Sequence, residues 1–324
     1  MKNYLKKTDS IFLAGHNGMV GSSIHRHLLN QQYKNVITAD KEELDLRDQQ
    51  SVLDFFESTK IDVVIIAAAK VGGIYFNDNY PADFIFDNLM IEINLINSSH
   101  LTNVNRLLFL GSSCIYPRES KQPIREDYLL NGTLELTNES YSIAKIAGIK
   151  MCESYNRQYH RDYRSLMPTN LYGPNDNFHP ERSHVLPALL RKIHEAKDKD
   201  SNIVVWGTGK PMRDFLHVDD LASASLFILN IGKTEYNKFV SDRCSHVNVG
   251  SGSEVSIKEL AILIGNIIGY NGTIIYDKSK PDGTMRKILD TNLINSMGWR
   301  SKINLKSGIE LTYSWFLENP NLVG

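Results

Sequence analysis

The sequence contains little cysteine: Cys114, Cys152 and Cys244 are the full set in 324 residues. An odd number of cysteines at wide spacings is not typical of a disulfide framework or of a zinc site. We therefore predict reduced thiols and no protein-bound metal ion.

Long hydrophobic runs and an excess of charge are also lacking. No segment approaches the roughly 18 apolar residues of a membrane-spanning helix, and the opening MKNYLKKTDS lacks the apolar core of a secretory signal. The formal net charge is -1, with both signs interspersed, which is not typical of proteins that bind nucleic acid or anionic membranes. These absences predict a cytoplasmic globular protein without nucleic-acid or membrane partners.

Short apolar runs alternate with longer helix-like segments through the first half of the chain. The runs are SIFLAG ending at Gly15, NVITAD ending at Asp40, VVIIAAA at 63–69, RLLFLGS at 106–112 and YRSLMPTN at 163–170. Such alternation predicts βαβ units and a parallel sheet. Because each run is nearly continuous, we expect helices on both faces of a doubly wound sheet of the Rossmann type.

The pattern changes after residue 170, where turns rich in Gly and Pro appear, such as YGPNDNFHP and WGTGKPMRDF. We predict a dinucleotide-binding domain over 1–170 and a smaller α/β substrate domain over 171–324, with 214–250 partly packing back on the first. The clearest helix of the second lobe is predicted at 255–269, because Ser256 and Glu259 fit a capping box.

A glycine-rich turn stands at the end of the first predicted strand. Gly15, Gly18 and Gly21 in GHNGMVG open a predicted helix that begins with Met19 and Val20. Glycine permits a tight turn and a close approach of a pyrophosphate, and a helix N-terminus favours an anion. A glycine turn without a ligand is the alternative, but the strand before it and the helix after it favour a dinucleotide site.

The preference for NADP or NAD is determined at the end of the second predicted strand. An acidic residue there favours NAD, and a basic residue accommodates a 2′-phosphate. The chain presents Asp40 and then Lys41, and Asn17 lies in the glycine turn. We predict NADP(H), with NAD(H) as the alternative.

Two segments place a lysine four residues after a tyrosine: YSIAK holds Tyr141 and Lys145, and YDKSK holds Tyr276 and Lys280. If 140–155 is helical, the first pair shares one helix face. An ammonium group there would bring the tyrosine pKa toward the working range of an acid or base. The second pair follows a short predicted strand and precedes a proline, so it lacks helical geometry. We predict that Tyr141 is catalytic.

Ser112, in LGSSCIYP, ends a predicted strand and supplies a hydroxyl for a substrate oxygen. With the glycine turn and the first tyrosine–lysine pair, it resembles the pattern of extended short-chain dehydrogenases/reductases that act on nucleotide sugars. Further motifs resemble the GDP-L-fucose synthase family from Phe12 to the terminal WFLEN. These motifs are AAAKVGGI, LGSSCIYP, YSIAKIAG, MPTNLYGPNDNFHP, SHVLPALLRK, VVWGTGKPMRDFLHVDD and KPDGTMRK.

The resemblance implies epimerisation of a GDP-4-keto-6-deoxy-hexose at carbons 3 and 5, followed by NADPH-dependent reduction at carbon 4 to give GDP-L-fucose for surface polysaccharide. Ser112, Tyr141 and Lys145 would serve the reduction. Cys114 would be the base and His184 the acid of the epimerisation, roles that a thiolate and an imidazole can fill near neutral pH. A small buried cysteine and a helix-capping histidine are the structural alternatives.

The resemblance also implies two sets of binding residues. The cofactor set is Gly15, Asn17, Gly18, Met19, Val20, Gly21, Asp40, Lys41, Ala68, Lys145, Pro168, Asn170, Leu171 and His184. The substrate set is Ser113, Asn170, Lys192, Trp206, Arg213 and Asp282. Basic residues in the substrate set suit a diphosphate, and Trp206 suits stacking on guanine, with a place in the core as its alternative.

Other interpretations stay open. Related enzymes act on GDP-colitose precursors or GDP-4-keto-heptoses, some without epimerising, and Asn17 departs from the arginine often found in bacterial members. A non-catalytic sensor of nucleotide sugars or dinucleotides is a rival on the same fold, although intact Ser112, Tyr141 and Lys145 argue against it. A dehydratase or 4-epimerase is disfavoured, because Cys114 stands where a dehydratase has an acidic pair. The resemblance further implies a homodimer, formed through a helical bundle that includes the helix of Tyr141.

Overall fold

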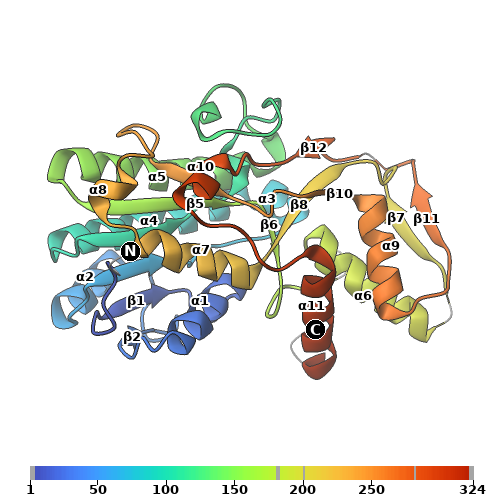
Figure 1. Cartoon of the computed structure of the whole chain (residues 1–324), viewed down its shortest axis with the longest axis horizontal. Helices are drawn as coiled ribbons and strands as arrows, with labels where there is room; N and C mark the ends of the chain where they lie inside the picture. The colour runs from blue at the N-terminus through green and yellow to red at the C-terminus, as the bar shows by residue number, and fades with distance from the viewer. Residues whose placement is uncertain (1–3, 180–182, 200, 281, 321–324) are drawn as a thin grey trace.

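A parallel sheet forms the centre of the first lobe (Figure 1). The computed structural model describes residues 4–179, 183–199, 201–280 and 282–320. The described strands are ordered β2-β1-β3-β4-β5-β9, and all their pairings are parallel. They are β1 (Ile11–Ala14), β2 (Val36–Ile37), β3 (Val63–Ile66), β4 (Arg106–Leu110), β5 (Asp162–Pro168) and β9 (His246–Val249). The predicted Rossmann sheet is confirmed, and its strand order reverses beside β1, where such sheets bind ligands.

Helices cover both faces of this sheet. One face carries α1 (Met19–Asn30) and α7 (Val218–Asn230); the other carries α2 (Gln49–Ser58), α4 (Pro81–Leu101) and α5 (Glu139–Tyr159). Successive residues of a strand point to opposite faces. Leu13 therefore packs in one apolar cluster with Ile24, whereas Phe12 packs in the other with Val52. The doubly wound arrangement is confirmed.

The second lobe lies to the right in Figure 1 and has its own apolar core. Its strands are β6 (Asn170–Tyr172), β7 (Ile203–Trp206), β8 (Met212–His217), β10 (Glu254–Ser256), β11 (Ile274–Asp277) and β12 (Arg286–Lys287). Its helices are α6 (Val185–Asp198), α9 (Ile257–Ile268) and α11 (Leu305–Glu318). The capping box of α9 is confirmed: Glu259 donates its N–H to Ser256 Oγ at 3.1 Å, and Ser256 donates its N–H to Glu259 Oε2 at 2.9 Å.

The chain crosses between the lobes more than once. After residue 170, α7, α8 (Lys233–Tyr236) and β9 lie with the first lobe, and so does α10 (Asn292–Met297). Trp299 is buried in the same core as β1. The structure thus adds 292–299 to the segment 214–250 that sequence analysis places against the first lobe, while the domain boundary at 170 stays a prediction.

Short elements complete the described chain. They are α3 (Ile74–Asn79) and three 3-10 helices, η1 (Ser113–Ile115), η2 (Glu126–Tyr128) and η3 (Leu136–Asn138). Among the described helices, none combines the length and apolarity needed to cross a bilayer. The cytoplasmic location stays a prediction.

Candidate active site

The glycine turn joins β1 to α1 at the carboxyl edge of the sheet. Gly15 has φ +85°, and a Cβ there would lie 2.6 Å from the Cα of Ala68. A Cβ on Gly21 would overlap the carbonyl oxygen of Gly15. At Gly18, a Cβ would make only an ordinary contact of 3.6 Å with the Gly15 oxygen. Internal packing therefore explains two of the glycines, and Gly18 fits a turn kept open for a dinucleotide phosphate.

Asp40 lies three residues after the end of β2, where the adenosine ribose would be bound. Asn17 donates its side-chain N–H to Asp40 Oδ1 at 2.5 Å, and His16 Nε2 lies 3.6 Å from the same oxygen. Lys41 is exposed beside it. Asn17 therefore fixes the position of the Asp40 carboxylate.

The other predicted cofactor residues lie at strand ends or in the first turn of α1. Ala68 follows β3, Pro168 ends β5, Asn170 and Leu171 lie in β6, and Met19 and Val20 begin α1. Asn170 donates its side-chain N–H to the carbonyl of Asp214 at 2.8 Å. Its amide nitrogen therefore ties β6 to β8, which leaves its oxygen for a ligand.

Ser112 and Tyr141 meet where β4 ends. Ser112 caps η1 by accepting the N–H of Cys114 at 3.3 Å. Burial raises the pKa of Tyr141 above its ordinary value, nearby Cys114 and Glu92 add to the rise, and a hydrogen bond with Ser112 opposes it. A tyrosine with a raised pKa keeps its proton at neutral pH, which suits a general acid.

Lys145 does not lower the pKa of Tyr141 as the sequence predicts. Its Nζ lies 2.9 Å from Glu92 Oε1, and the two side chains are only 2% and 1% exposed. The same Nζ lies 4.8 Å from the Phe109 ring centroid and 5.8 Å from that of Tyr141. Glu92 neutralises the ammonium, so Tyr141 experiences burial without a net positive neighbour.

Cys114 is partly exposed and lies among polar groups. Asn138 donates its side-chain N–H to the Cys114 sulfur at 3.3 Å, and Lys287 donates from Nζ to the same sulfur at 3.6 Å. Both donors favour negative charge on sulfur. The alternative of an inert, buried cysteine does not fit this position, although it does fit Cys152, whose side chain is fully buried.

His184 stands at the N-terminus of α6, where its side chain makes no capping hydrogen bond. The residue is exposed at the surface. Desolvation by neighbouring protein atoms lowers the pKa of His184, and the charge of Lys287 lowers it further. A helix cap is therefore not the reason for a histidine here, and its protonated form would be a stronger acid than free imidazole.

Trp206 ends β7 on the surface and is 66% exposed. Two lysine ammonium groups lie near its ring: Lys192 Nζ is 6.0 Å and Lys280 Nζ 5.5 Å from the centroid. The core alternative for Trp206 is wrong. An exposed indole between two cations suits a base attached to a diphosphate.

Arg213 in β8 is mostly buried, and burial lowers its pKa. Its Nη1 donates to the carbonyl oxygens of Met212 and Thr284, at 2.8 and 2.6 Å. Among the described residues, no carboxylate lies within ion-pair distance of it. A guanidinium without a carboxylate partner is suited to a phosphate.

Asp282 and Ser113 have structural contacts at their predicted positions. Both Asp282 oxygens accept from Thr208, from its N–H at 2.8 Å and its hydroxyl at 2.7 Å. These bonds lower the pKa of Asp282 and close the turn after Trp206. Ser113 is buried within η1. No group of three or more His, Cys, Asp or Glu suited to a metal occurs in the described part of the chain.

Comparison with known proteins identifies the family. Residues 11–250 match the NAD dependent epimerase/dehydratase family. GDP-L-fucose synthase of Escherichia coli (strain K12) is 56% identical over 312 residues, which are 96% of this chain and 97% of that protein. The chain belongs to the NAD dependent epimerase/dehydratase family. Its match to GDP-L-fucose synthases over nearly the full length confirms the predicted resemblance and the prediction of an oxidoreductase enzyme.

Two further relatives of this epimerase/dehydratase family member act on other sugars according to their names. GDP-L-colitose synthase of Yersinia pseudotuberculosis is 38% identical, covering 96% of this chain and 99% of that protein. A solved GDP-D-glycero-L-gluco-heptose synthase from Campylobacter jejuni, in the presence of NADPH, has a TM-score of 0.90 and 37% identity, covering 97% of this chain and 100% of that chain. Nucleotide-sugar enzymes with different sugars thus share this fold.

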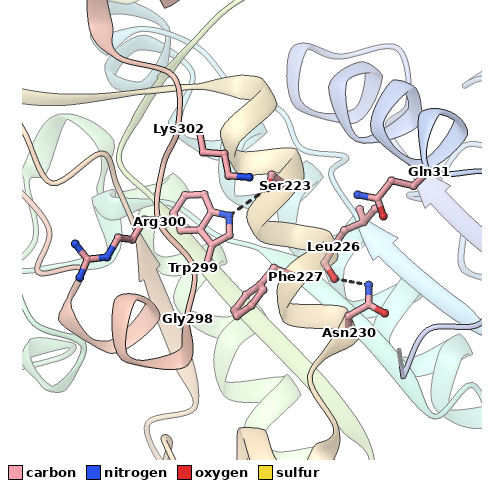
Figure 2. Close-up of a pocket in the computed structure, with 9 residues that line it drawn as sticks. All are labelled: Gln31, Ser223, Leu226, Phe227, Asn230, Gly298, Trp299, Arg300 and Lys302. Carbon is pink, nitrogen blue, oxygen red and sulfur yellow. Dashed lines mark hydrogen bonds between the residues drawn. The ribbon is translucent and has the colours of Figure 1, made fainter. Parts of the chain in front are cut away.

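A cavity of about 340 Å³ lies away from these residues, between α7 and residues 298–302 (Figure 2). Trp299 donates its indole N–H to Ser223 Oγ at 3.2 Å, and Asn230 donates to the carbonyl of Leu226 at 2.9 Å. These polar groups satisfy one another. None of the described residues that line this cavity is a predicted site residue.

Sequence reasoning about this epimerase/dehydratase family member missed Glu92, Asn138 and Lys287. Glu92 is an acid within the apolar helix run MIEINLI, and such an isolated charge is a usable signal for a buried partner. Lys287 is the last residue of the motif KPDGTMRK. The resemblance of this motif to the family does not indicate a contact with Cys114. Asn138 carries no distinguishing local pattern.

Proposed function

We propose that the protein epimerises GDP-4-keto-6-deoxy-D-mannose at carbons 3 and 5 and reduces carbon 4 with NADPH, forming GDP-L-fucose. The observation that carries this proposal is the grouping of Ser112, Tyr141 and Cys114 at the end of β4. A proton donor for the reduction and a candidate base for the carbon-bound proton therefore lie together. The 56% identity to a GDP-L-fucose synthase supports the assignment.

The cofactor would be held by the turn from Gly15 to Gly21, by Asp40 and Lys41 at the ribose, and by Lys145. When bound, NADPH supplies the hydride for the reduction. We propose NADP(H) over NAD(H), because Asn17 holds the Asp40 carboxylate and Lys41 stands exposed beside it. The heptose synthase from C. jejuni in the presence of NADPH supports the same choice.

Epimerisation requires a base and an acid on opposite sides of the sugar. A proton next to a ketone is acidic when the resulting enolate oxygen is held by donors. Cys114 takes the proton, the C–H electrons form the enolate, and the Ser112 and Tyr141 hydroxyls hold its oxygen. His184 then returns a proton from the other side, which inverts the carbon.

Reduction uses the same donors for a different purpose. Hydride addition at carbon 4 places negative charge on the oxygen, and Tyr141 donates the proton that neutralises it. Ser112, hydrogen-bonded to Tyr141, aligns the oxygen. Across the second lobe, Arg213 and Lys192 bind the diphosphate and Trp206 stacks on guanine.

Incubation with GDP-4-keto-6-deoxy-D-mannose in deuterated water tests the proposal. We expect deuterium at carbons 3 and 5 without cofactor, and GDP-L-fucose on adding NADPH, with slower conversion on NADH; NMR and mass spectrometry measure both. Reduction without deuterium means a reductase only, and no reaction means another keto sugar or a sensor. Either result overturns the proposed activity.

Replacing Cys114 by Ser removes the proposed base with little change of shape. Deuterium uptake is expected to fall by about 100-fold or more, because a hydroxyl is a far weaker base than a thiolate. NADPH oxidation continues and yields sugar that is not fully epimerised. Cys244→Ser is the matched control, since Cys244 is also partly exposed and burial raises its pKa to about 11. Unchanged uptake in Cys114→Ser removes its role.

The proposed assembly is a homodimer through α4 and α5, which pack side by side. Phe86 and Ile93 lie seven residues apart on α4, both exposed, and Ile143 of α5 is also exposed. We expect light scattering to give twice the chain mass, and Phe86→Glu to give the monomer mass. Leu317→Glu, an exposed position on α11, is the control that stays dimeric. A monomeric parent protein contradicts this prediction.

A further inference from the structure

Lys287 reaches from the second lobe to the sulfur of Cys114. It lies in β12, which pairs in parallel with β8 so that Lys287 stands beside Arg213. Its Nζ donates to Cys114 Sγ at 3.6 Å, across 173 residues of sequence. Its neighbour Arg286 points elsewhere and forms an ion pair with Glu254 at 2.8 Å. Because successive side chains of a strand point to opposite faces, the charges of Arg286 and Lys287 lie on opposite sides of β12.

No carboxylate balances the charge of Lys287 among the described residues, in contrast to Lys145 and its partner Glu92. Its Nζ contacts Cys114, and its charge contributes to the lowered pKa of His184. Asn138 of η3 is a neutral second donor to the same sulfur, and Tyr141 of α5 is the other titratable group that interacts with it. An ammonium without a counter-ion favours a thiolate beside it.

We propose that Lys287 is the charge partner of the epimerisation base and stabilises the thiolate of Cys114, whose sulfur its Nζ contacts. The inference rests on the proposed function. The steps balance within the protein: the thiolate takes a proton from carbon, and the C–H electron pair becomes the enolate. The imidazolium then protonates the opposite face and becomes imidazole. A proton moving from the new thiol to this imidazole restores the pair for the second carbon.

Three variants separate charge, hydrogen bonding and structure. Lys287→Met removes both the charge and the donor, Lys287→Gln keeps an N–H donor without the charge, and Lys287→Arg keeps the charge. Arg286→Met is the matched control on the same strand. Melting temperatures and GDP binding show which variants are folded.

The first readout is alkylation of Cys114 by iodoacetamide, followed by peptide mass spectrometry that distinguishes it from the other cysteines. We expect about tenfold slower alkylation in Lys287→Met and Lys287→Gln, with the parent rate largely restored in Lys287→Arg and unchanged in Arg286→Met. A purely structural role would not follow the charge in this way. Alkylation at the parent rate in the folded Lys287→Met or Lys287→Gln protein overturns the inference.

The second readout is deuterium uptake into the keto sugar compared with single-turnover reduction. Uptake is expected to fall by about tenfold or more in Lys287→Gln, with a smaller effect on the hydride step. Equal losses in both steps overturn a role specific to epimerisation. If the parent protein takes up no deuterium, both the proposed function and the epimerisation role of Lys287 are overturned. The alkylation rates still show, independently, whether the charge of Lys287 stabilises the Cys114 thiolate.

Discussion

Tyr141→Phe is expected to lower the rate of reduction at carbon 4 by about 10³-fold. The variant keeps the ring and loses only the hydroxyl that interacts with Ser112. Without that proton, hydride addition leaves a negatively charged alkoxide beside a position that burial shields from water. The raised pKa of Tyr141 means that the parent enzyme holds this proton at neutral pH. Single-turnover loss of nicotinamide absorbance measures the effect.

Tyr276→Phe provides the matched control for this experiment. It removes a hydroxyl from the second tyrosine with a lysine four residues later, which lies in β11, a strand and not a helix. Its reduction rate should equal that of the parent protein. NADPH and GDP binding should persist in Tyr141→Phe, measured by calorimetry. Turnover of Tyr141→Phe within about tenfold of the parent would refute Tyr141 as the acid.

The second large effect concerns stability and comes from Glu92. Glu92→Gln leaves the Lys145 ammonium buried without its partner, since both side chains are almost fully inaccessible. Breaking a buried ion pair by removing one member destabilises a protein by about 3–5 kcal/mol. The free energy of unfolding, measured by urea denaturation, should fall by about this amount.

A double variant distinguishes charge pairing from simple loss of packing. Glu92→Gln combined with Lys145→Met removes both charges, and replacing a whole buried pair by neutral groups is often close to neutral for stability. We expect most of the lost unfolding free energy to return, although reduction stays slow because Lys145 is absent. If the double variant is as unstable as the sum of both single variants, the ion pair does not determine stability here.

The partners of Lys145 and Lys287 could not be predicted from the sequence. The spacing of four residues correctly placed Tyr141 and Lys145 on one helix, because α-helical geometry depends only on local sequence. It assigned the charge of Lys145 to Tyr141, whereas the structure pairs that charge with Glu92 from a different helix. The same limitation hid Lys287, whose contact with Cys114 depends on how β12 pairs with β8.

The sequence by itself determined the elements that follow from local and periodic patterns. These are the parallel strands β1 to β5, the glycine turn with Gly15 and Gly21, the capping box of α9 and the helix of Tyr141, whereas β9 was not predicted. Tertiary structure alone decided which polar side chains meet: Lys145 with Glu92, Asn17 with Asp40, and Lys287 with Cys114. The physical reason is that backbone geometry repeats over a few residues, whereas these ion pairs and hydrogen bonds form between side chains that folding brings together from distant parts of the chain.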